Sequence, residues 1–110
     1  MSKILIIEDE ESIRRVLKKV LIQENKKYEI VEAVDGVDGI SKINSGKYDL
    51  ILCDIKMPKK DGIEVLKYVL KESPSTPTIM ISGHGDLETA VESMRLGAFD
   101  YISKPPDLNR

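Results

Sequence analysis

Residues 48–62 read YDLILCDIKMPKKDG, and this stretch decides the fold because its character changes abruptly at Asp54. Leu50 to Cys53 form a continuous apolar run, which is typical of a parallel strand covered on both faces. The run ends in a carboxylate and is followed by residues typical of a turn, Met57-Pro58 and Asp61-Gly62. The stretch predicts a buried central strand with Asp54 at its end. By itself it is equally consistent with an Asp54 that only caps the turn.

A second apolar run, residues 3–7, ends in the same way, at Glu8 and Asp9. Three further segments have the character of strands: residues 28–33, 78–82 and 101–103. Between them, apolar residues recur at helical spacing and are bounded by Gly, Pro or acidic residues. We therefore expect four helices: from Ser12 to about Leu21, from Val37 to Gly46, from Gly62 to about Ser73, and from an N-cap at Asp86 to Gly97.

The alternation of strands and helices predicts an α/β fold. Such an order favours one doubly wound, five-stranded parallel sheet of the flavodoxin-like kind, with right-handed crossovers and helices on both faces. The strand order 2-1-3-4-5 is one of the two common orders in doubly wound sheets, and we expect it on that general ground. It would place the first and third strands side by side and bring Asp9 close to Asp54.

Composition limits the classes of protein to consider. A chain of 110 residues with 41% hydrophobic residues fits one globular domain, residues 1–110. Seventeen basic and nineteen acidic residues give a net charge of -2, which argues against direct binding of nucleic acid. The apolar run near the N-terminus is too short for a signal peptide or a membrane span, and acidic residues follow it directly. We therefore expect a cytoplasmic protein without a membrane partner. The single cysteine, Cys53, is expected to be a buried small hydrophobe.

The predicted strand ends carry chemistry on one edge of the sheet. In chain order they offer the carboxylates of Glu8, Asp9 and Asp54, the hydroxyl of Ser82 and the ammonium of Lys104. Neighbouring carboxylates repel one another, and a hard divalent cation with oxygen ligands relieves the repulsion. We therefore expect a Mg²⁺ site in which Asp9 and Asp54 are ligands and Glu8 is an outer or water-mediated one.

A carboxylate beside a bound cation can also act as a nucleophile toward a phosphoryl group and form an acyl phosphate. Asp54 is the candidate, because it ends the central strand. Phosphoryl transfer depends mainly on positioning and on neutralisation of the charge on the phosphoryl oxygens. Lys104 and Ser82 are expected to supply part of that neutralisation.

The residues at these positions carry a resemblance to a known family. IEDEE at residues 7–11, CDIKMPKKDG at 53–62, MISG at 80–83 and DYISKP at 100–105 occur in the order found in receiver domains of bacterial two-component response regulators. The resemblance extends from Lys3 to Pro105. Residues 83–105 are most similar to receivers of sigma-54-dependent, nitrogen-regulation-type transcription activators.

The resemblance implies a phosphoacceptor that serves a sensor histidine kinase. It implies that Asp54 is the modified residue, that the main-chain carbonyl of Lys56 is a further Mg²⁺ ligand, and that the Lys104–Pro105 peptide is cis. It also implies a switch in which Ser82 moves toward the phosphoryl group and Tyr101 turns into the space it leaves. Such a protein phosphorylates and dephosphorylates itself but turns over no external substrate, so we do not class it as an enzyme.

Three alternative functions remain open at this stage. Within the family, the chain could be a stand-alone receiver or a phosphorelay shuttle. From another class, an aspartyl-phosphate phosphatase-like hydrolase would also carry an Asp after a strand, but it would need a second acid where this chain has Lys56. A receiver-like module that is never phosphorylated would be expected to lack Asp9, Asp54 or Lys104, and all three are present.

The end of the chain departs from the family pattern. Receivers normally have a fifth helix, which the sequence lacks, so we expect a C-terminally incomplete domain and a homodimer favoured by exposed apolar surface. In the regulators that the chain resembles, the receiver continues into an ATPase domain and a DNA-binding domain, which are the expected output partners.

Overall fold

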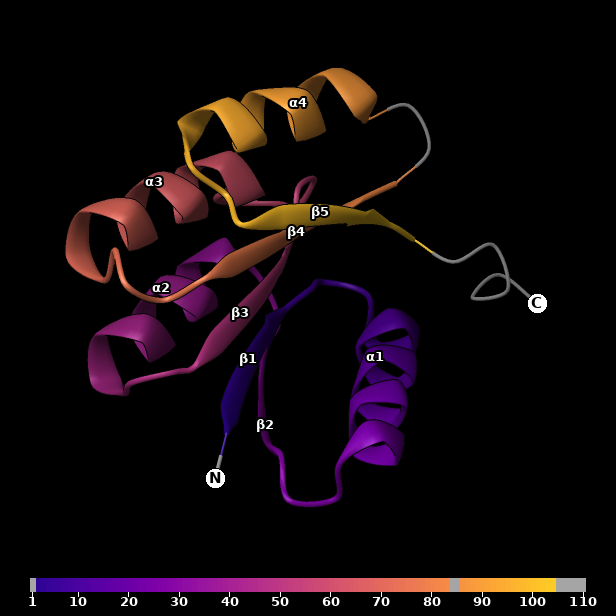
Figure 1. The fold of residues 1–110 in the computed structure, drawn as a ribbon. Helices are drawn as coiled ribbons and strands as arrows, with labels where there is room; N and C mark the ends of the chain where they lie inside the picture. Colours follow the sequence, from indigo (N-terminus) through magenta and orange to yellow (C-terminus); the bar gives the residue numbers. More distant parts are fainter. Residues whose placement is uncertain (1, 84–85, 105–110) are drawn as a thin grey trace.

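The structure is a computed structural model that describes residues 2–83 and 86–104. Strands and helices alternate along the described chain (Figure 1). The strands are β1 (Lys3–Ile7), β2 (Glu29–Ala33), β3 (Leu50–Asp54), β4 (Thr78–Ser82) and β5 (Asp100–Ser103). The helices are α1 (Glu11–Glu24), α2 (Gly36–Ser45), α3 (Gly62–Glu72) and α4 (Leu87–Leu96).

The strands form one five-stranded sheet in the order β2-β1-β3-β4-β5, and every neighbouring pair is parallel. The predicted order is confirmed. The central position of β3 explains its continuous apolar run, because both faces of this strand are covered: Ile51, Leu52 and Cys53 are all buried.

Helices cover both faces of the sheet, as expected. In Figure 1, α1 lies on one side of the strands and α2, α3 and α4 lie on the other. The larger core forms under the three helices and includes Leu5, Cys53, Val65 and Met80. The smaller core forms under α1, where Ile13 and Leu17 pack near sheet residues such as Ile6 and Ile81.

Local chemistry sets several element boundaries. The Asp35 and Asp61 side chains accept hydrogen bonds from backbone amides in the first turns of α2 and α3, which is typical N-capping. Gly97 ends α4 with a φ of 126°, a left-handed conformation that favours glycine.

The expected N-cap at Asp86 is confirmed in position, because Asp86 directly precedes α4 and its carbonyl accepts a hydrogen bond from the Ala90 amide at 2.9 Å. Its side chain, however, makes no capping bond; Oδ2 instead accepts a hydrogen bond from the amide of Gly83, three residues earlier, at 2.9 Å. The carboxylate cannot cap the helix because it faces the loop before α4, where it also forms an ion pair with Lys56. Smaller differences occur in α1, which continues to Glu24, and in β5, which begins one residue early, at Asp100.

Two expectations fall outside the described residues: the cis Lys104–Pro105 peptide and the missing fifth helix after it. Within the described part of the chain, no helix has the length and apolar character needed to cross a membrane.

Candidate functional site

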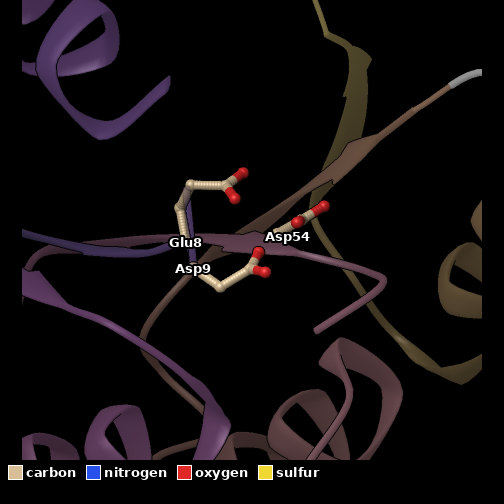
Figure 2. A group of neighbouring side chains, drawn as sticks. All are labelled: Glu8, Asp9 and Asp54. Carbon is tan, nitrogen blue, oxygen red and sulfur yellow. The ribbon is translucent and has the colours of Figure 1, made fainter. Parts of the chain in front are cut away.

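The acidic residues predicted from the strand ends do meet in space. Ile7 of β1 lies opposite Cys53 of β3, so Glu8 and Asp9 leave the sheet beside Asp54. Figure 2 shows the three side chains at this edge of the sheet. One carboxylate oxygen of each residue lies within 4.8 Å of the others.

Glu8 is held more tightly than an acidic loop residue usually is. Its backbone amide donates to Ala33 O at 3.1 Å, which extends the β1–β2 pairing by one residue. Its side chain is fully buried, and Oε2 accepts a hydrogen bond from the Glu10 amide at 3.0 Å. Oε1 has no hydrogen-bond partner among the described residues. Asp9, by contrast, is exposed.

Asp54 is also buried, and one of its oxygens is satisfied by a lysine. Lys104 Nζ donates to Oδ2 at 3.2 Å and lies 3.6 Å from Glu8 Oε1. Oδ1 has no hydrogen-bond partner in the described part of the chain. A buried carboxylate oxygen without a partner is costly, so both orphaned oxygens indicate that a further cation or donor belongs at this site.

The burial of these groups changes their ionisation. Burial is the main reason that the pKa of Glu8 is raised to about 8, and the Asp54 carboxylate adds to the effect. Burial also raises the pKa of Asp54, against the opposing effect of Lys104. For Lys104, burial alone would lower the pKa, but the carboxylates of Asp54 and Glu8 outweigh it and raise the pKa overall.

The donor set fits a Mg²⁺ ion. Three carboxylates with converging oxygens, two of them buried with an orphaned oxygen, are the hard ligands that this cation prefers. A bound cation would replace mutual repulsion by attraction and satisfy the orphaned oxygens.

The two residues expected to act as a switch lie at the β4–β5 edge. Ser82 Oγ donates to the backbone carbonyl of Ile102 at 3.4 Å. Tyr101 is half-buried and packs against the larger core. Both residues therefore lie on neighbouring strands, and β4 itself adjoins β3, which carries Asp54.

Lys56 has a role in the structure that the sequence did not suggest. Its ammonium lies 2.9 Å from Asp86 Oδ1, while the Asp86 side chain is only 5% exposed. The pKa of Asp86 is lowered despite burial, because Lys56 and the Gly83 amide stabilise the carboxylate. This ion pair joins the loop after Asp54 to the start of α4. Sequence spacing alone offers no signal for it, since 30 residues separate the partners.

Comparison with known proteins identifies the family. Residues 4–110 match the family described as the response regulator receiver domain. This chain belongs to that family. The receiver is 37% identical to the receiver domain of NtrX from Brucella abortus, with a TM-score of 0.87 over 97% of this chain and 89% of the other.

Curated relatives of this receiver are transcriptional regulators. The transcriptional regulatory protein ResD of Bacillus subtilis is 43% identical over 94% of this chain, and the DNA-binding transcriptional regulator NtrC of Proteus hauseri is 36% identical over the same share. The receiver spans 42% of the length of ResD and 22% of that of NtrC. The expected similarity to nitrogen-regulation-type, sigma-54-dependent activators is confirmed, and other response regulators are among the relatives too.

Proposed function

We propose that this receiver accepts a phosphoryl group on Asp54 from a sensor histidine kinase and passes the signal to an output surface. The observation that supports the proposal best is the arrangement around Asp54. The buried carboxylate lies beside two further acids, Glu8 and Asp9. It also accepts a hydrogen bond from Lys104, which directly follows β5.

The chemistry follows from the groups present. An Asp54 carboxylate oxygen attacks the phosphorus of a phosphohistidine, an O–P bond forms, and the P–N bond to the histidine breaks as the imidazole leaves. Glu8, Asp9, Asp54 and the main-chain carbonyl of Lys56 would hold Mg²⁺, which supplies neutralisation of the charge on the phosphoryl oxygens. Lys104 is placed to contribute a second positive charge, because its ammonium already contacts Asp54.

Signal output is assigned to Ser82 and Tyr101. When Asp54 is phosphorylated, the Ser82 hydroxyl would exchange its contact with the Ile102 carbonyl for a phosphoryl oxygen. Tyr101 would then turn toward the space left by Ser82 and change the surface formed by α4 and β5. Phosphate shifts the population between the two arrangements because it makes contacts in only one of them.

The wider context follows from the relatives. We propose that residues 1–110 are the receiver part of a cytoplasmic transcription regulator, with an ATPase and a DNA-binding domain as output partners. A stand-alone receiver or a phosphorelay shuttle is the alternative. The receiver itself turns over no external substrate and removes its phosphoryl group by its own hydrolysis.

The proposal is tested by intact-mass analysis after incubation with a small phosphodonor and Mg²⁺. We expect one added phosphoryl group on the wild type and none on Asp54→Asn or in the presence of a chelator. Absence of the addition from a folded sample that binds Mg²⁺, even with a histidine kinase as donor, would show that Asp54 is not a phosphoacceptor.

A further inference from the structure

We propose that Arg14 is a positioning residue for the acidic cluster, because it fixes the main chain between Glu8 and Asp9 and thereby directs the Asp9 carboxylate. The inference rests on the proposed role of that cluster in binding Mg²⁺. Arg14 lies near the start of α1 and bonds to Glu8 and Glu32, so it would act through the residues that it holds.

The contacts of Arg14 join two strands. Nη1 donates to the backbone carbonyl of Glu8 at 2.7 Å, and Nε donates to Glu32 Oε1 on the edge strand β2 at 3.3 Å. The planar guanidinium can serve two acceptors in fixed directions, which a lysine ammonium on its flexible stem does less well. The Arg14 side chain is only 11% exposed, and Lys18 also pairs with Glu32, at 3.6 Å.

The Glu8 carbonyl belongs to the peptide that leads into Asp9. Because this peptide is planar, holding its oxygen sets the direction in which Asp9 leaves the strand. The amide on the other side of Glu8 is already held by Ala33 O at 3.1 Å. The exposed Asp9 carboxylate lies within 4.8 Å of the carboxylates of Glu8 and Asp54. Asp9 reaches this cluster from the main chain whose Glu8 carbonyl Arg14 holds.

A role through charge alone predicts the opposite effect on Mg²⁺ binding. A cation near a cation site repels the ion, so neutralising Arg14 would tighten Mg²⁺ binding if only its charge mattered. If Arg14 positions the ligands, the same change weakens binding, because the ligands must then be ordered by the metal itself. The sign of the change in affinity decides between the two roles.

The experiment measures the Mg²⁺ dissociation constant by isothermal titration calorimetry on this chain. We expect Arg14→Gln and Arg14→Lys to weaken binding about tenfold, the lower end of the usual effect of removing a group that orients metal ligands. Arg15→Gln is the matched control, since Arg15 lies on the same helix, carries the same charge, is 72% exposed and, among the described residues, pairs only with Glu11. A change of less than about twofold is expected there, because exposed charges are screened.

Three further measurements separate positioning from a general loss of structure. Glu32→Gln should weaken Mg²⁺ binding less than the Arg14 variants do, because Arg14 keeps its bond to Glu8 but loses its charged partner. The phosphorylation rate of Arg14→Lys should fall at limiting Mg²⁺ and return to within about twofold of wild type at saturating Mg²⁺. Thermal unfolding without Mg²⁺ checks that each variant is folded.

The outcomes distinguish this inference from the proposed function. Unchanged or tighter Mg²⁺ binding in folded Arg14→Gln and Arg14→Lys, beside a wild type that binds Mg²⁺, overturns the positioning role alone. A folded wild type that binds no Mg²⁺ overturns the metal role in the proposed function, and the positioning role with it.

Discussion

The burial of one side chain, Glu8, changes the ionisation of the acidic cluster. The sequence predicted an outer or water-mediated metal ligand, which suits an acid at the surface. The structure buries the side chain completely, so that Glu8 carries a pKa of about 8 while the neighbouring Asp9 stays exposed. Two adjacent acids of similar chemistry therefore differ because one turns toward the protein interior and the other toward solvent.

The raised pKa of Glu8 predicts a pH-dependent stability. The pKa is about 8 in the folded protein against a model-compound value of 4.5, so the folded state holds a proton that the unfolded state has lost between these pH values. The contribution of Glu8 to stability is therefore fully present below pH 4.5 and is lost as the pH rises toward about 8. In the absence of Mg²⁺, Glu8→Gln should melt at least about 4 °C above wild type at pH 8, equivalent to about 1 kcal/mol for a domain of this size.

Thermal unfolding of both proteins at pH 5 and pH 8 measures this effect. The advantage of Glu8→Gln should shrink at pH 5, where wild-type Glu8 is mostly protonated in the folded state. Mg²⁺ should stabilise the wild type at pH 8 more than it stabilises the variant, because only the wild type retains the third carboxylate. An advantage of the same size at both pH values would show that Glu8 is not responsible.

At the scale of elements, the loop between β3 and α3 is packed tightly against its neighbours. Lys56 pairs with Asp86 before α4, and Lys59, which has a φ of 69°, pairs with Asp35 before α2 at 3.4 Å. A methyl group on Gly62 would clash with the backbone carbonyl of Asp54. The start of α3 is thus pressed against the residue proposed to accept phosphate.

Gly62→Ala is expected to destabilise the protein by about 1–3 kcal/mol, the usual cost of forcing an extra carbon into a packed site. The clash is with backbone, which cannot move without shifting Asp54 or α3. Gly46→Ala is the matched control, because the nearest atom to its added carbon among the described residues would be the Tyr48 hydroxyl oxygen, at 3.5 Å. Urea unfolding of both variants measures the difference, and equal stabilities would contradict the tight packing of this loop.

At the scale of the whole molecule, the two faces of the sheet are covered unequally by the described residues. Three helices pack on one face, and α1 alone packs on the other (Figure 1). Ile102 of β5 lies opposite Ile81, which belongs to the core under α1 and is fully buried. Ile102 itself is 40% exposed, so the apolar surface on the α1 side continues beyond the part that α1 covers.

We expect this surface to promote the homodimer that the sequence predicts. In light scattering, the apparent mass of the chain should rise with concentration, and Ile102→Lys should reduce the rise. Val37→Lys is the control, since Val37 is 48% exposed on α2, over the other face of the sheet. A stable monomer over a wide range of concentration would contradict the expectation.

The sequence alone determined the elements, their type and the edge of the sheet that carries the chemistry. Periodicity and turn residues depend on local backbone preferences, which a short window of sequence already contains. The continuous run before Asp54 likewise predicted a strand buried on both faces, and the strand-end acids predicted the cluster. The motifs around them carry the family resemblance in the sequence itself.

Only the tertiary structure decided how these residues act on one another. Three contacts join residues on different parts of the chain: the bond from Lys104 to Asp54, the Lys56–Asp86 ion pair and the bond from Arg14 to the Glu8 carbonyl. The burial of Glu8 likewise depends on the packed sheet. Such contacts depend on how strands and helices pack, and packing is not encoded at any fixed spacing along the chain. The electrostatics of the site therefore emerge only when the sheet assembles and removes these carboxylates from water.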